Sequence, residues 1–98
     1  LAPTRELANQ IESELVKFTA FEKVRSLSVY GGTPIVPQLR ALRQNAPSVV
    51  VGTPGRVIDL IDRGALKLSE VNYVILDEAD EMLDMGFFDD VTTILEQV

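Results

Sequence analysis

Three carboxylates stand at the end of an apolar run in the last third of this 98-residue sequence. The run at residues 73–76 predicts a buried strand, and Asp77, Glu78 and Asp80 follow it directly. Ligands of open parallel sheets bind beyond the carboxyl ends of the strands. One such carboxylate can hold Mg²⁺ through its waters while its neighbour orients or deprotonates an attacking water, as after a Walker B strand. The plain alternative is a set of solvated acids that favour a helix start.

A nucleotide-hydrolysing site also needs a loop that cradles phosphate. The sequence has no segment that fits G-x-x-x-x-G-K-[ST], and the pair Gly31-Gly32 lacks the lysine and hydroxyl that would follow. That pair either lets a backbone approach closely or simply makes a turn. The 98 residues therefore carry one half of a hydrolytic site. Either the other half lies outside them, or the carboxylates have another role.

Hydroxyl and proline residues occur together at three expected helix starts. These are Pro3-Thr4, Thr33-Pro34 and Thr53-Pro54. A threonine N-cap with proline at the first helical position is ordinary capping. Helix N-termini also present free N–H groups and a positive dipole end, which bind phosphate without lysine. Arg5 and Arg56 stand beside two of these starts and are suited to charge-assisted contacts with phosphate oxygens.

Composition excludes several kinds of site. Zero cysteine excludes disulfides and thiolate metal sites, and zero histidine removes the usual zinc ligand and general base. Catalysis would have to run on carboxylates, hydroxyls, arginine and a hard metal ion. No apolar run of about 18 residues occurs, so we expect no membrane span. Lack of cysteine and of a leader favours an intracellular location, cytoplasmic or, in a eukaryote, nuclear.

The net charge of −6 hides an uneven distribution. Residues 1–67 hold all nine basic residues against six acidic ones, a net +3, whereas residues 68–98 hold nine acidic residues and no basic one, a net −9. Overall acidity argues against a nucleic-acid partner, because such proteins usually present basic surfaces. The split weakens that objection, since the basic part suits phosphate. The acidic part suits a metal ion or another partner, or forms a solvated helix face.

Helical and strand periodicities alternate along the chain. Apolar residues recur at helical spacing within residues 7–18, 35–42, 57–61 and 87–98. Short apolar or alternating runs predict strands at 25–30, 48–51 and 72–76. This order, with connections of a few residues, predicts an α/β fold in which helices cover a parallel sheet. Since Leu1 stands directly before a helix, we expect the strand that precedes this helix to be missing from the sequence.

Four segments, taken together, resemble the DEAD-box RNA helicases. In order they are Ala2-Pro3-Thr4-Arg5-Glu6-Leu7-Ala8, Gly31-Gly32, Thr53-Pro54-Gly55-Arg56 and Asp77-Glu78-Ala79-Asp80. The continuation at residues 82–87, Met-Leu-Asp-Met-Gly-Phe, is also similar to that family. The resemblance covers essentially the whole chain, and four motifs in register make it highly specific.

The resemblance implies an ATP-dependent helicase whose two RecA-like domains close on ATP and single-stranded RNA to unwind or remodel duplexes. Residues 1–98 would form the C-terminal portion of the first, ATP-binding domain, of RecA-like P-loop fold, without its Walker A loop. By this resemblance Asp77 and Glu78 serve the ATP and Mg²⁺ site, Asp77 positioning the ion and Glu78 activating the hydrolytic water, and Asp80 links the site to nucleotide-sensing motifs. Positions that match the grip on the RNA backbone are Pro3, Thr4, Arg5, Gly31, Gly32, Thr53, Pro54, Gly55 and Arg56. No aromatic stacking platform is evident, so contact without sequence preference is expected.

Several parts of the family pattern do not occur in these residues. They are the upstream glutamine segment, the Walker A loop, the Ser-Ala-Thr motif and the second RecA-like domain. We therefore expect an ATPase and helicase as the parent protein, and no ATP turnover by the 98 residues alone. The resemblance also places the Asp77 strand on the side of the missing Walker A strand, which predicts an unpaired apolar edge and dimerisation of the isolated chain. Two alternatives stay open: a non-catalytic RNA-binding or scaffold member, and a DNA-directed helicase or other P-loop NTPase.

Overall fold

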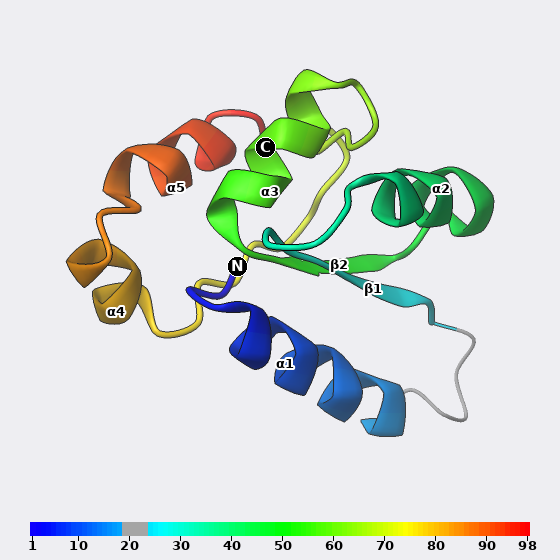
Figure 1. Cartoon of the computed structure of the whole chain (residues 1–98), viewed down its shortest axis with the longest axis horizontal. Helices are drawn as coiled ribbons and strands as arrows, with labels where there is room; N and C mark the ends of the chain where they lie inside the picture. The colour runs from blue at the N-terminus through cyan, green and yellow to red at the C-terminus, as the bar shows by residue number, and fades with distance from the viewer. Residues whose placement is uncertain (19–23) are drawn as a thin grey trace.

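Two parallel strands lie at the centre of the fold, with helices on both sides of them (Figure 1). The computed structural model describes residues 1–18 and 24–98. In chain order the elements are α1 (Arg5–Phe18), β1 (Ser26–Val29), α2 (Val36–Asn45), β2 (Val49–Gly52), α3 (Pro54–Asp62), α4 (Ala79–Asp84) and α5 (Phe88–Leu95). Strand β1 pairs with β2 from Ser26 opposite Val49 to Val29 opposite Gly52. The expected parallel α/β architecture is confirmed.

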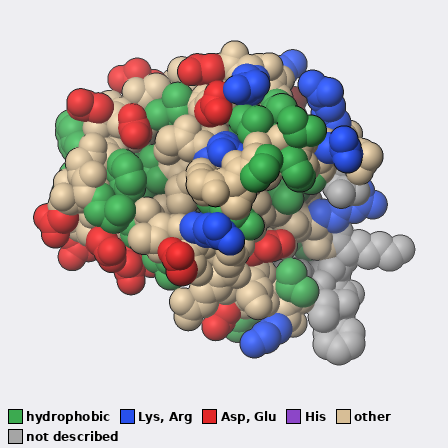
Figure 2. Space-filling view, in the orientation of Figure 1, with side chains coloured by type: hydrophobic (Ala, Val, Ile, Leu, Met, Phe, Trp, Pro, Cys, Tyr) green, Lys and Arg blue, Asp and Glu red, His purple; other side chains and the backbone are tan. Residues whose placement is uncertain are grey.

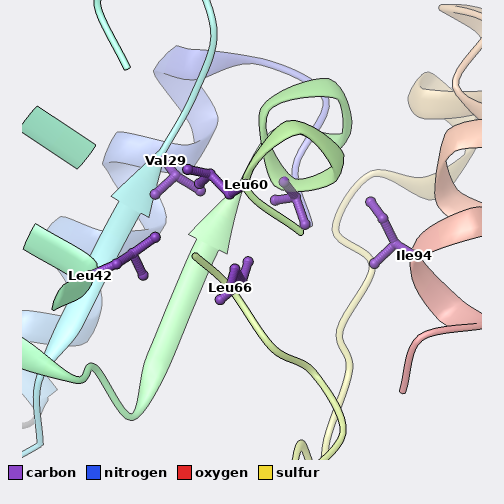
Figure 3. Packing of buried hydrophobic residues seen from close by; sticks show 6 residues of the cluster. Val29, Leu42, Leu60, Leu66 and Ile94 are labelled. Carbon is purple, nitrogen blue, oxygen red and sulfur yellow. The ribbon is translucent and has the colours of Figure 1, made fainter. Parts of the chain in front are cut away.

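The alternation of side chains along the strands produces two cores, one on each face of the sheet. Val29 contributes to the larger core with α2, α3 and α5. Figure 3 shows it together with Leu42, Leu60, Leu66 and Ile94, with Ile94 on the opposite side of the cluster from Leu42. Val51 faces the other way and packs with Ala2 and Ala8 under α1. Helices cover both faces, so the carboxyl ends of β1 and β2 remain open and lie side by side at one edge of the sheet.

The helix starts differ in how they are capped. The Thr4 hydroxyl accepts a hydrogen bond from the Leu7 N–H at 3.2 Å, so the predicted cap of α1 is confirmed. Thr53 occupies the N-cap position of α3 but makes no side-chain capping bond. Thr33 is not a cap at all, because α2 begins at Val36 after the N-cap Ile35. The prediction that Thr33-Pro34 starts a helix was wrong. The Thr33 hydroxyl instead accepts a hydrogen bond from Gln38, and its carbonyl accepts one from Arg56.

Residues 73–76 do not form the buried strand that their composition predicts. Tyr73 is 88% exposed and Ile75 is 74% exposed. Two backbone hydrogen bonds, both with Leu1, run along the segment: the Leu1 nitrogen donates to the Ile75 carbonyl at 2.7 Å, and the Asp77 N–H donates to the Leu1 carbonyl at 3.0 Å. A single residue alongside cannot build a strand ladder, so the segment stays extended without becoming part of the sheet.

The acidic end of the chain contains two short helices, where the apolar spacing predicts one. α4 ends near Met85, and Gly86 follows with φ of +82°, a conformation that favours glycine. α5 then begins at Phe88 and packs against α3. Among the described residues no helix has both the length and the apolar character needed to cross a membrane.

Candidate functional site

The four segments singled out in the sequence meet at the carboxyl edge of the sheet. Thr53 N–H donates to the Val29 carbonyl at 3.1 Å, which joins the ends of the two strands. Ala2 N–H donates to the Gly52 carbonyl at 3.0 Å, and Leu1 is bonded in turn to Asp77. In Figure 1 the N-terminus accordingly lies between the strand ends and the segment that leads to α4. The order along this edge, called the rim below, is 30–33, 53–56, 1–5 and 77–80.

The first segment of the chain brings a cation to the rim. Arg5 is exposed at the start of α1, and its guanidinium carbon lies 5.2 Å from the centroid of the Tyr30 ring. Such a cation–π contact at an exposed site is worth about 0.5–1 kcal/mol. Arg5 is therefore held loosely enough to exchange the ring for a phosphate. Pro3, by contrast, is buried and contributes by fixing the backbone.

The segment after β2 offers backbone donors at the N-terminus of α3. Pro54 is buried at the first helical position, and Gly55 beside it is exposed with open space around its Cα. First-turn N–H groups of a helix have no intrahelical partner and attract anions. Arg56 also lies here, but its Nη1 donates to Gln38 Oε1 and its Nη2 to the Thr33 carbonyl, both at 2.9 Å.

The segment after β1 contributes the glycine pair. Gly31 and Gly32 are exposed, and a Cβ added at either would meet no atom within 4 Å. Gly32 has φ of +80°, so the turn needs a residue that tolerates the left-handed region. The pair therefore makes a turn, and the open space beside it is compatible with close approach of a ligand, which stays a prediction.

The carboxylates occupy the far end of the rim, and all three are exposed. Glu78 lies at the N-cap of α4 with φ of 52° and ψ of 53°, in the left-handed region that non-glycine residues rarely occupy. A side-chain hydrogen bond with Glu81, followed by repulsion from the Glu81, Asp77 and Asp80 carboxylates, raises the pKa of Glu78 above its usual value. Backbone strain of this kind clusters at functional sites.

The donor set around Asp77 is suited to magnesium. Within residues 1–18 and 24–98 no group of three or more His, Cys, Asp and Glu side chains is arranged to hold a metal ion. Mg²⁺ in nucleotide sites, however, is bound through one or two carboxylates, with waters and substrate phosphates as the remaining ligands. Exposed carboxylates at a sheet edge fit that requirement, so Asp77 is a residue that could hold the ion.

Sequence reasoning missed Gln38, which lies in α2 and bonds to the rim. Gln38 donates through Nε2 to the Tyr30 carbonyl at 3.1 Å and to the Thr33 hydroxyl at 3.3 Å. A signal was present, because Gln38 falls at the helical spacing of Ile35 and Leu42 and so occupies a core-facing position of α2. A polar residue at such a position needs buried partners.

A model of the DEAD/DEAH box helicase family matches residues 1–98, that is, the whole chain. The chain belongs to this family. Its sequence is 56% identical over its full length to the ATP-dependent RNA helicase CshA of Listeria monocytogenes, and 59% identical to the DEAD-box ATP-dependent RNA helicase 9 of Oryza sativa subsp. japonica. It spans only 19% and 15% of the length of these two relatives.

Solved DEAD-box structures share the fold as well as the sequence. A DEAD box protein from Methanococcus jannaschii matches 99% of the chain with a TM-score of 0.91 at 48% identity, over 26% of its own length. A hypothetical ATP-dependent RNA helicase from Sulfolobus tokodaii matches 98% with a TM-score of 0.91 at 42% identity, over 28% of its own length. The RecA-like fold class expected from the motifs is therefore confirmed.

Proposed function

We propose that the chain is the C-terminal portion of the ATP-binding RecA-like domain of an ATP-dependent RNA helicase. The observation that carries the proposal is the rim, where four separate segments present phosphate-binding groups and carboxylates along one sheet edge. In the parent protein, one part of this edge binds the backbone of single-stranded RNA and the other acts on ATP. A Walker A loop and a second RecA-like domain, supplied by the rest of the parent, complete the site.

The RNA part comprises the three segments nearest the strand ends. Gly31, Gly32 and Gly55 are exposed and leave their backbone open to a phosphate group, and Arg5 adds a positive charge that can reach it. Thr4 and Thr53 stand at the N-terminal ends of α1 and α3 at the same edge, and the buried Pro3 and Pro54 restrict the backbone beside them. The groups offered here are backbone amides, hydroxyls and a guanidinium, which suit phosphate, so the contacts would read the backbone and not the sequence.

The nucleotide part consists of the carboxylates. When bound, Mg²⁺ would neutralise developing charge on the ATP phosphates. Asp77 would hold the ion, and Glu78 would orient or deprotonate the attacking water. Asp80, two residues further in α4, links this end of the rim to the nucleotide-sensing parts of the protein. Because ATP and RNA are the proposed ligands, the expected location is the cytoplasm or, in a eukaryote, the nucleus.

The test of this function is phosphate release by the full-length parent protein, measured with single-stranded RNA, with single-stranded DNA and without nucleic acid. RNA should stimulate the rate and DNA should not. Glu78→Gln should lower the stimulated rate by about 10²–10⁴-fold, because the water loses its base, while ATP binding persists. No phosphate release with or without RNA would support the non-catalytic scaffold alternative, and equal stimulation by DNA would support a DNA-directed enzyme. A rate that does not respond to RNA would contradict the proposed function.

We also propose that the isolated 98-residue chain self-associates through residues 73–76. Tyr73 and Ile75 are largely exposed there, and the backbone of the segment is bonded only to Leu1 on one side. An apolar edge without a neighbouring strand recruits further strands. Light scattering over a range of concentrations should show a mass that rises above the monomer. A monomer mass at every concentration would rule out this association. The same sample should release no phosphate from ATP, with or without RNA.

A further inference from the structure

Gln38 joins two segments of the rim, residues 30–33 and 53–56, through one buried side chain. Gln38 lies in the first turn of α2. Among the described residues it is the polar side chain that is buried, with 8% of it exposed. Its Nε2 donates to two groups of the turn after β1, and its Oε1 accepts from Arg56 at the start of α3. The amide nitrogen of Gln38 thus bonds to the connection after β1, and the amide oxygen bonds to the connection after β2.

Arg56 closes this arrangement into a ring. Its Nη2 donates to the Thr33 carbonyl at 2.9 Å, while Thr33 Oγ1 accepts from Gln38. The orientation of the Gln38 amide follows from the chemistry, since a guanidinium only donates and must face the oxygen. Buried side-chain polar atoms all have partners in the described part of the chain, so the ring is fully satisfied.

The turn that the ring holds has little else to fix its shape. Gly31 and Gly32 lack side chains, and open space surrounds both Cα positions. Gln38 donates hydrogen bonds to the turn on either side of this pair, at Tyr30 and at Thr33. Beyond the strand pairing and the Thr53–Val29 bond, the glycine turn is therefore fixed to the N-terminus of α3 by Gln38 and Arg56.

We propose that Gln38 is a positioning residue for RNA, which with Arg56 fixes the glycine turn and the start of α3 at the spacing that adjacent phosphates require. The inference rests on the proposed RNA-binding function and deepens it. A rim fixed before binding loses less conformational entropy when RNA arrives, so affinity rises without any new contact. Arg56 then acts mainly through its internal hydrogen bonds, whereas the exposed Arg5 supplies the mobile charge.

The ring can be dissected with three substitutions in the full-length parent protein. Gln38→Met keeps the volume and removes all three bonds of the amide. Gln38→Glu keeps an acceptor for Arg56 but cannot donate to the Tyr30 carbonyl. Arg56→Lys offers a point charge that cannot span Gln38 and Thr33 together. The readouts are the RNA concentration for half-maximal ATPase stimulation, the KM for ATP and kcat at saturating RNA.

The positioning role predicts a split between these readouts. Gln38→Met and Arg56→Lys should each raise the half-maximal RNA concentration about tenfold, with Gln38→Glu about threefold. The KM for ATP and kcat at saturating RNA should stay within about twofold of wild type. The double variant, Gln38→Met with Arg56→Lys, should raise the half-maximal RNA concentration no further than the single variant with the larger effect, because both substitutions break the same ring.

Two results overturn the positioning role. One is an unchanged half-maximal RNA concentration in Gln38→Glu and Arg56→Lys, which retain polar side chains and so remain informative even where Gln38→Met does not fold. The other is a parallel loss of kcat, ATP affinity and melting temperature, which indicates a purely structural role. A wild-type protein whose ATPase ignores RNA contradicts the proposed function itself, and so the two failures are distinguishable.

Discussion

Arg5 and Arg56 occupy the same rim but are held in different ways. Arg56 is half-buried and gives both Nη atoms to internal hydrogen bonds, whereas Arg5 is exposed and lies over the face of the Tyr30 ring. Residue type and spacing predicted the same phosphate-binding role for both. The distinction depends on which carbonyl and amide groups the fold brings within reach, and sequence spacing does not contain that information.

Gly52 shows a second residue-scale constraint. A Cβ at this position would meet Cγ2 of Val57, and it would lie 2.9 Å from Cγ2 of Val29. Glycine is therefore required for β2 and the first turn of α3 to pack closely, and not only for ending the strand.

Gly52→Ala should destabilise the protein by about 1–3 kcal/mol through overpacking, because the neighbouring methyl groups are buried in the core. Denaturant unfolding of the parent domain measures this change. Gly31→Ala is the matched control, since its Cβ would enter open space and its φ lies outside the left-handed region. Equal stability of the two variants would contradict the packing account.

At the scale of elements, a helix start could be predicted where its capping bonds join residues that are close in the sequence. The cap of α1 involves Thr4 and Leu7 alone and follows from the sequence. The start of α2 does not, because Thr33 is drawn into the ring with Gln38 and Arg56 from other elements. The strand expected at residues 73–76 failed for the same reason, since a strand needs neighbours that local composition cannot supply.

The α1 cap carries an element-scale prediction. Thr4→Ala should lower the free energy of unfolding by about 0.5–2 kcal/mol, because the Leu7 N–H loses its acceptor. Thr4→Ser keeps the hydroxyl oxygen and should retain most of that stability. Denaturant unfolding of both variants measures the difference. A serine variant as unstable as the alanine variant would show that the Thr4 methyl group, and not the cap, stabilises the helix.

At the scale of the whole molecule, charge is segregated as the sequence indicates. Figure 2 shows acidic side chains gathered on the side where α4 and α5 lie, and basic side chains mainly elsewhere on this face. The four segments on the rim were predictable because the carboxyl ends of parallel strands share one edge. The order of the segments was not, since it depends on Leu1 pairing beside Asp77.

The most direct test of the rim as an RNA phosphate site is the salt dependence of RNA binding by the full-length protein. The association constant for single-stranded oligouridine is measured in the presence of a non-hydrolysable ATP analogue. Its logarithm should fall linearly with the logarithm of the salt concentration. Arg5→Gln should make the slope shallower by about 0.7, the value for one phosphate contact with a single strand. Arg63→Gln, which removes an exposed arginine paired with Asp59 near the far end of α3, should leave the slope unchanged. A wild-type slope in Arg5→Gln, or an equal change in both variants, would contradict RNA binding at the rim.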